Sequence, residues 1–310
     1  MTAPRQVIAE SHLMLTRRVT QRKLLLRPDA RTVQIYTYCL AEAAERFNVT
    51  LYGWIAMSNH EHVLVCDLHG NGPEFMAHFR KMLAKAMNRY RGRSENFWSS
   101  EQANVVRLFQ PTDLFEKLVY MLANPVAAEL VDRASDWPGA TSLMQNISGR
   151  EVIVKRPVGY FRDKGPMPKE VVLRVTRIPG YEHLTADEWR DKLLGAVRHT
   201  EDRARASRLA TQRPVLGRKA VLATDPESRP SRAERPRRVR PHIAARDPKQ
   251  RVEALRAMTS FRAAHRAARQ RFRAGDREVI FPEGTYKMRR LGARCADDPP
   301  RPAALSSSRL

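Results

Sequence analysis

The segment over residues 49–68 constrains the fold of this chain more than any other. Val49 to Met57 is a run of β-branched, aromatic and aliphatic residues, and Glu61 to Leu68 is a second apolar run. Ser58 and Asn59, which lie between the two runs, favour a turn. Strand-forming runs on either side of a turn predict two adjacent strands. The chain is therefore predicted to contain a sheet that includes this hairpin.

Helix and strand patterns alternate through the rest of the first 150 residues. Pro28 and Asp29 have the chemistry of a helix start, and Pro125 predicts a break at the end of a later helix. The predicted elements are strands within 7–19 and 103–109 and helices over 28–47, 73–90 and 112–124. With the hairpin included, the order is strand, helix, strand, strand, helix, strand, helix.

The pattern is weaker after residue 150. Thr185 and Glu188 form a capping box that opens a helix, and Gly275 ends a second, basic helix. A hairpin is predicted over 279–288. The predicted parts are a front domain over 1–150, an extension with a helix over 151–224, a flexible linker rich in Arg and Pro over 225–248, a basic helix with a short hairpin over 249–292, and a disordered tail over 293–310.

Charge is the most unusual property of the composition. The formal net charge is +23. Residues 1–150 carry about +4 of it and the remaining residues about +19. Such an excess predicts a polyanionic partner, with DNA or RNA favoured over an anionic membrane surface. The front half has the charge balance of a globular domain, and the back half that of a nucleic-acid clamp.

Membrane and export signals are not expected in this sequence. Its apolar runs fall short of the roughly 18 residues that cross a bilayer, and its first residues lack the pattern of a signal peptide. Cys39, Cys66 and Cys295 are widely spaced and lack metal-binding spacing, as is typical of buried thiols in a reducing compartment. The expected location is the cytoplasm, with no membrane partner.

His60 and His62 lie two residues apart at the start of a predicted strand. Alternate residues of a strand share a face, so two imidazoles side by side can chelate one divalent ion. Taken alone, this short pattern is more often a pair of surface or hydrogen-bonded histidines. Cys66 shares their face but lies about 13 Å along the strand, so a structural zinc centre is not supported.

Tyr120 lies at the centre of the polar face of the helix over 112–124. At 100° per residue, Glu116, Lys117 and Asn124 lie within about 60° of Tyr120. Five apolar residues fall about 100° to 220° from it: Leu114, Phe115, Leu118, Met121 and Leu122. A surface tyrosine with no chemical role is an equally good interpretation. The functional hypothesis is an oxygen nucleophile, with Asn124 and Glu116 as oxygen ligands for Mg²⁺ or Mn²⁺.

Two segments resemble the single-tyrosine HUH transposases. Residues 54–65, WIAMSNHEHVLV, resemble the HUH motif, and residues 118–142 resemble the tyrosine helix and turn of REP-associated and insertion-sequence-200-like transposases. In that family the tyrosine precedes an Asn-Pro pair by four residues, and a Trp-Pro pair and a Ser follow; here the tyrosine is Tyr120. Residues 15–29 are also similar to the family's opening, and the resemblance covers roughly residues 8–145. Glu61 departs from the usual apolar middle residue and is expected to alter packing or pair with an arginine.

The resemblance implies an α+β fold with a ferredoxin-like antiparallel sheet and packed helices, to which this chain adds a basic, mainly helical C-terminal extension. Residues 1–150 would be the catalytic domain of a DNA transposase. Tyr120 would attack single-stranded or hairpin DNA and form a 5′-phosphotyrosine link, which permits strand transfer without ATP. His60 and His62 would bind Mg²⁺ or Mn²⁺, with Asn124 as a third ligand and Glu116 as a less favoured one.

A groove for single-stranded DNA needs basic side chains. The candidates are Arg17, Arg18, Arg22, Arg80, Lys81, Arg89 and Lys117. Two alternatives remain open: a domesticated nucleic-acid-binding protein that does not cleave, and a metal-dependent phosphodiesterase that uses water. A monomer and a homodimer are equally compatible with the sequence.

Overall fold

The computed structural model describes residues 4–230 and 241–297. These residues belong to two compact units. One unit comprises residues 9–247, and the other comprises residues 1–8 together with 248–310. Across the described residues, no helix combines the length and the apolar character that crossing a bilayer requires.

The larger unit is built on a five-stranded sheet with the order β2-β3-β1-β4-β7. Pairing is antiparallel throughout except between β4 and β7, which run parallel. The strands are β1 (Ser11–Arg18), β2 (Val49–Met57), β3 (His60–Asp67), β4 (Asn104–Leu108) and β7 (Ile243–Ala244). The predicted hairpin is confirmed as β2 and β3, and Met57 pairs with His60 across the turn.

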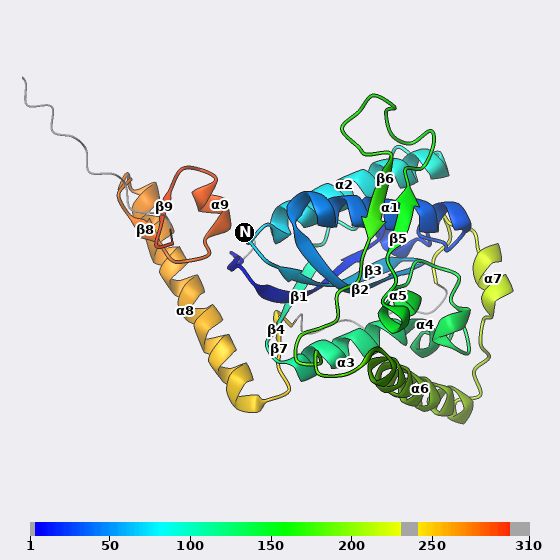
Figure 1. Cartoon of the computed structure of the whole chain (residues 1–310). Helices are drawn as coiled ribbons and strands as arrows, with labels where there is room; N and C mark the ends of the chain where they lie inside the picture. The colour runs from blue at the N-terminus through cyan, green and yellow to red at the C-terminus, as the bar shows by residue number, and fades with distance from the viewer. Residues whose placement is uncertain (1–3, 231–240, 298–310) are drawn as a thin grey trace, which may run out of the picture. The chain divides into compact units, whose positions relative to one another are not determined.

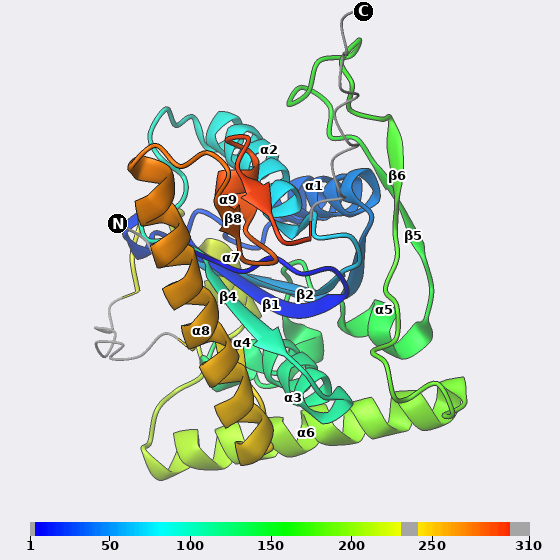
Figure 2. The same cartoon turned by 90° about the vertical axis from the view of Figure 1, so that its left-hand side faces the viewer.

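Helices cover both faces of this sheet, as the two views in Figures 1 and 2 show. α1 (Ala30–Phe47) and α2 (Gly72–Arg91) lie on one face, where their apolar residues pack with alternate sheet residues such as Leu15 and Val63. Asp29 caps α1 by accepting a hydrogen bond from the Thr32 amide, as the sequence predicted for the start of this helix. The result is a mixed α+β fold with a mainly antiparallel sheet.

The opposite face of the sheet is covered by α3 (Pro111–Leu122), and α6 (Ala186–Ala210) packs against α3 on the side away from the sheet. The predicted capping box opens α6, since Thr185 and Glu188 each accept from the other's backbone amide. Trp189 anchors α6 in this core: its side chain is buried and its indole N–H donates to the Asn146 carbonyl at 2.8 Å. Shorter elements complete the unit: η1 (Thr20–Arg22), α4 (Asn124–Ala127), η2 (Ala134–Asp136), α5 (Leu143–Ser148) and α7 (Arg218–Ala223).

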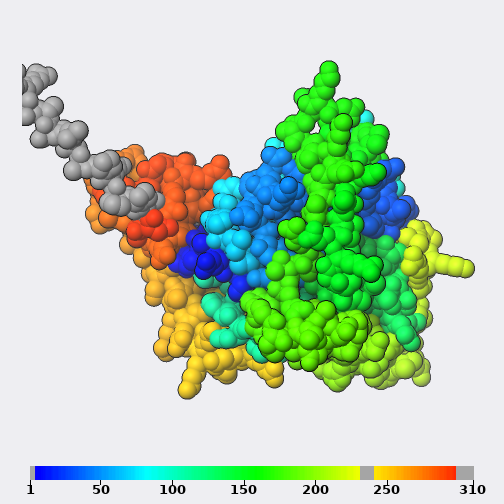
Figure 3. All heavy atoms as spheres, in the orientation of Figure 1, coloured from blue at the N-terminus to red at the C-terminus, as the bar shows by residue number. Residues whose placement is uncertain are grey.

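The hairpin of β5 (Val152–Lys155) and β6 (Glu170–Leu173) was not predicted from the sequence. Val154, Val171 and Leu173 are buried in the core that includes α1, and the connection between the two strands protrudes from the surface in Figure 3. Together with α6, this hairpin makes residues 151–224 part of the same compact unit as the front half. The back half is therefore not a single addition that begins at residue 150.

The flexible linker predicted over 225–248 is wrong for its last residues. Ile243 and Ala244 form β7, which pairs with Arg107 and Leu108 of β4. Ile243 is buried and Ala244 is half-buried at the edge of the sheet. Their packing there favours a strand, although the neighbouring residues are rich in Arg and Pro. Residues 231–240 of the predicted linker lie outside the described residues.

The smaller unit contains α8 (Pro248–Arg273), β8 (Ile280–Phe281), α9 (Tyr286–Arg289) and β9 (Arg294–Cys295). Gly275, at φ 102°, follows the end of α8 as predicted. The predicted hairpin over 279–288 is wrong, because β8 pairs in parallel with β9 and α9 forms the crossover that parallel strands need. β9 also falls in the predicted disordered tail, of which residues 298–310 lie outside the described part of the chain.

His265 of α8 is buried against Phe261 and Phe281 in the core of the smaller unit. Burial, and to a lesser extent Arg269, lowers the pKa of His265 below its ordinary value of 6.5. The unfolded chain then binds this proton more tightly, so the unit should lose stability as the pH falls from about 6.5. We expect hydrogen-exchange protection factors over 261–281 to fall between pH 7.5 and 5.5. An equal fall in His265→Leu would show that another group is responsible.

Candidate active site

His60 and His62 lie on the face of β3 that α3 covers. Because strand side chains alternate, both imidazoles point the same way, and their ring centroids are 4.9 Å apart at an interplanar angle of 86°. His62 is buried, with 6% of its surface exposed, whereas His60 is half-buried. Glu61, between them, points to the opposite face and is fully buried.

Hydrogen bonds fix the orientation of both imidazoles. Nδ1 of His60 donates to Oδ1 of Asn59 at 2.7 Å, and Nδ1 of His62 bonds with Oγ1 of Thr16 at 2.8 Å. Nδ2 of Asn124 lies 3.3 Å from Nε2 of His62. These partners are compatible with a proton on Nδ1 of each ring, which would leave Nε2 with the lone pair that a metal needs. Thr16 was not predicted as a site residue, because its place opposite His62 depends on the register of β1 and β3.

Tyr120 reaches this site from the last turn of α3. Leu118, Met121 and Leu122 are buried beneath the helix, and Tyr120 is half exposed, as its place on the polar face predicted. The Tyr120 ring centroid lies 6.0 Å from that of His62, at 74° between the ring planes. Nζ of Lys117, one turn earlier, lies 5.8 Å from the same ring. The structure thus brings the predicted tyrosine, histidine and lysine together.

Asn124 enters the site because the helix breaks just before it. α3 ends at Leu122, and a short helical segment begins at Asn124 with Pro125 near its start. Proline lacks the backbone N–H that would continue α3, which explains the break. Asn124 is 9% exposed and its amide faces His62. Glu116, the less favoured candidate ligand, instead accepts a hydrogen bond from Arg246 at 3.1 Å.

Two imidazoles and one amide are the donors that could hold a divalent ion here. Within residues 4–230 and 241–297, no three His, Cys, Asp or Glu side chains are arranged to hold a metal, so a third protein ligand must be of another kind. Turning the Asn124 amide about its last bond would bring its oxygen near Nε2 of His62. The present separation of 3.3 Å is close to the roughly 3 Å between neighbouring ligands at about 2.1 Å from one ion. The residues therefore fit a divalent cation with oxygen and imidazole ligands.

Two of the predicted DNA-binding arginines have structural partners instead. Arg80 is buried on α2, and its Nε donates to Glu61 at 2.8 Å, which confirms that Glu61 pairs with an arginine. Arg17 donates to the carbonyls of Ser99 and Glu101, at 2.7 and 2.6 Å, and so fixes the loop before β4. The assignment of Arg80 to DNA binding is therefore wrong, since a buried guanidinium cannot reach a phosphate. Lys81 and Arg89 are exposed, and Arg18, Arg22 and Lys117 are half-buried.

Removal of the Arg80 guanidinium should destabilise the protein. Burial raises the pKa of Glu61, and Arg80 is the main group that opposes this shift. Arg80→Met would leave the Glu61 carboxyl buried without its partner, at a cost of about 3 kcal/mol in the free energy of unfolding. Urea unfolding measures this directly. The double variant Glu61→Leu, Arg80→Met should recover most of the loss, and equal destabilisation of the single and double variants would contradict the pairing.

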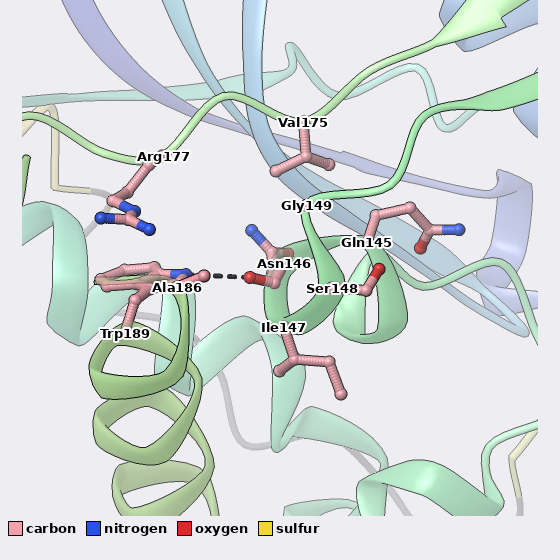
Figure 4. Close-up of a pocket in the computed structure, with 9 residues that line it drawn as sticks. All are labelled: Gln145, Asn146, Ile147, Ser148, Gly149, Val175, Arg177, Ala186 and Trp189. Carbon is pink, nitrogen blue, oxygen red and sulfur yellow. Dashed lines mark hydrogen bonds between the residues drawn. The ribbon is translucent and has the colours of Figure 1, made fainter. Parts of the chain in front are cut away.

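A cavity of about 170 Å³ lies apart from the histidine pair, between α5, the segment at Val175 and Arg177, and the start of α6 (Figure 4). Asn146 spans it: its Nδ2 donates to the Tyr52 carbonyl, and its own carbonyl accepts from Trp189. None of its lining residues belongs to the site on β3 and α3. Through these two hydrogen bonds, Asn146 links β2 to α6.

The comparisons with known proteins found a distant structural likeness and no match in sequence. No protein-family model matches the sequence, and no curated protein matches it. Among solved structures, the chain is similar to a REP-associated tyrosine transposase bound to a REP hairpin. The two share 15% sequence identity with a TM-score of 0.41, over 60% of this chain and 99% of that one.

Proposed function

We propose that this protein cuts and rejoins single-stranded or hairpin DNA through a covalent link to Tyr120. One observation carries the proposal: the tyrosine of α3 and the histidine pair of β3, which are about 60 residues apart in sequence, meet at a ring separation of 6.0 Å. Asn124 lies against the same histidine. A half-exposed phenol beside two oriented imidazoles is suited to attack on a phosphate.

The order of the elements supports the family that the sequence resembles. β1, α1, β2, β3, α2 and β4 follow one another in the chain, and their strands lie in the order β2-β3-β1-β4. This order supports a ferredoxin-like fold, whose elements follow one another as βαββαβ. Both resembling segments, residues 54–65 and 118–142, contribute to one site, as the HUH transposase assignment requires.

In the proposed reaction the Tyr120 oxygen bonds to phosphorus as the bond from phosphorus to the 3′ oxygen breaks. The phenol loses its proton to solvent, the departing 3′ oxygen takes up a proton, and the DNA remains attached through its 5′ phosphate. Lys117 would favour the negative charge of the attacking phenolate. Attack by a second 3′ hydroxyl on the phosphotyrosine reverses these steps and joins the strands. The phosphodiester energy is kept in the link, so ATP is not needed.

His60, His62 and Asn124 would hold a divalent cation, Mg²⁺ or Mn²⁺, beside the tyrosine. When bound, the ion would supply a positive charge that polarises the scissile phosphate. Asn59 and Thr16 would keep the imidazoles aimed at it, in the manner of outer-shell groups in metal sites.

The test is a nicking assay with the full chain and DNA hairpins labelled at either end. With Mn²⁺ present, we expect cleavage that leaves a free 3′ hydroxyl on one product and protein on the 5′ end of the other. With EDTA, cleavage should stop. Multiple turnover with free 5′ phosphates would favour a phosphodiesterase that uses water, and binding without any cutting would favour a domesticated DNA-binding protein.

A further inference from the structure

Four arginines form a line along α8 of the smaller unit. At 100° per residue they fall within about 60° of one another, and the line is about 16 Å long. This arginine face consists of Arg262, Arg266, Arg269 and Arg273. The core-facing side chains of the same helix, among them Phe261 and His265, lie on the neighbouring side. The two faces are therefore distinct, and the arginines are not needed to build the core.

Three of these arginines lack carboxylate partners within the described residues. No Asp or Glu of residues 4–230 or 241–297 lies within salt-bridge distance of Arg262, Arg266 or Arg273. α6, a helix of similar length, shows the contrast. There Arg190 pairs with Asp187. Arg205 pairs with Asp202, and Arg208 pairs with Asp132.

Concentrated like charges are unfavourable for an isolated helix. Arginines three and four residues apart repel one another by a few tenths of a kcal/mol per pair. α8 contains three such steps in succession, from residue 262 to 266, 269 and 273. A polyanion along the helix would remove this repulsion, and phosphate matches the donor geometry of guanidinium.

The form of the polyanion follows from the aromatic rings of the smaller unit. Binding of single strands relies on open aromatic faces on which bases stack. Phe261 and Phe281 are buried, and guanidinium groups lie over the other two rings: Arg277 over Phe272 at 4.3 Å and Arg290 over Tyr286 at 5.7 Å. A DNA duplex needs no such stacking faces, because its bases are paired inside and its phosphates lie on the outside. The smaller unit is therefore better suited to a duplex than to a single strand.

We propose that the arginine face of α8 binds the phosphate backbone of duplex DNA, independently of base sequence. Its length of about 16 Å corresponds to roughly half a turn of a B-form helix. The inference rests on the proposed function in one respect, that the duplex in question is the stem of the hairpin substrate. The smaller unit then holds the stem, and the larger unit acts on the single strand.

Affinity as a function of salt tests this face. The full chain, in EDTA to prevent cutting, is titrated with a labelled blunt duplex and with a labelled single strand of the same length at several salt concentrations. Each lost phosphate contact lowers the slope of log K against log salt by about 0.9 for duplex DNA. We expect Arg262→Gln, Arg266→Gln, Arg273→Gln to lower the duplex slope by about 2 to 3 and to change single-strand binding far less.

Two variants serve as matched controls. Arg190→Gln, Arg205→Gln, Arg208→Gln removes the same charge from α6 and should leave the duplex slope within about 0.5 of the parent value. The triple variant Arg262→Lys, Arg266→Lys, Arg273→Lys keeps the positive charge and should restore most of the slope. This result separates loss of phosphate contacts from loss of folding. Equal effects of the α6 and α8 glutamine variants would overturn the proposal, as would an equal loss for single strands. Neither readout depends on cutting by Tyr120, so the two proposals can fail separately.

Discussion

Tyr120→Phe should abolish the covalent protein–DNA product and all strand transfer. The substitution removes one oxygen from a side chain that is half exposed, so the fold should keep its free energy of unfolding within about 0.5 kcal/mol. No other group can form the phosphotyrosine link. Hairpin binding should stay near the parent value because phosphate contacts elsewhere supply most of the affinity. Denaturing gels of protein incubated with labelled hairpin and Mn²⁺ measure the adduct.

Tyr181→Phe is the matched control for this experiment. Tyr181 belongs to the same compact unit but packs against Phe115 and Trp189 beneath α3. Its variant should form the adduct at the parent rate. Cutting by Tyr120→Phe with free 5′ phosphates would identify water as the nucleophile, and the phosphodiesterase alternative would then replace the proposed function.

His62→Ala should lower the rate of cutting by about 10³-fold or more, because the metal's contribution to phosphoryl-transfer chemistry is several kcal/mol. His60→Ala should act in the same direction, while binding of hairpin DNA in EDTA should be unchanged for both. Single-turnover cutting over a range of Mn²⁺ concentrations measures the effect.

Thr16→Val is a graded version of the same test. It removes the hydroxyl that bonds with Nδ1 of His62 but leaves both imidazoles in place. Loss of such an outer-shell partner typically weakens metal affinity 10- to 100-fold. Excess Mn²⁺ should therefore restore cutting by Thr16→Val but not by His62→Ala. Undiminished cutting by His60→Ala, His62→Ala together would remove the histidines from the mechanism.

Local patterns predicted most of the larger unit. β2 and β3 were predicted because strand-forming residues flank a turn, and α1 because Asp29 supplies a cap. The hairpin of β5 and β6 was missed because its strands contain four residues each and alternate over too short a stretch. β7 was missed because a strand of two residues is too short to show an alternation of apolar and polar side chains. Only its pairing with β4 defines it as a strand.

Periodicity also placed the main groups of the site on the correct faces. The two-residue period of a strand put His60 and His62 together, and the helical period put Tyr120 opposite the core. Contacts that depend on tertiary structure were beyond these patterns. Arginine is usually a surface residue, so Arg80 was assigned to DNA binding. Its ion pair with the buried Glu61 instead makes it part of the packed interior.

The central claim is that Tyr120 becomes linked to DNA, and mass mapping of the adduct tests it most directly. Parent protein is incubated with hairpin DNA and Mn²⁺, digested with nuclease and protease, and its peptides are searched for nucleotide phosphate. The account predicts one modified peptide, the tryptic segment that follows Lys117, with the added mass on Tyr120. A modification on any other residue, or cutting without a modified peptide, would contradict it.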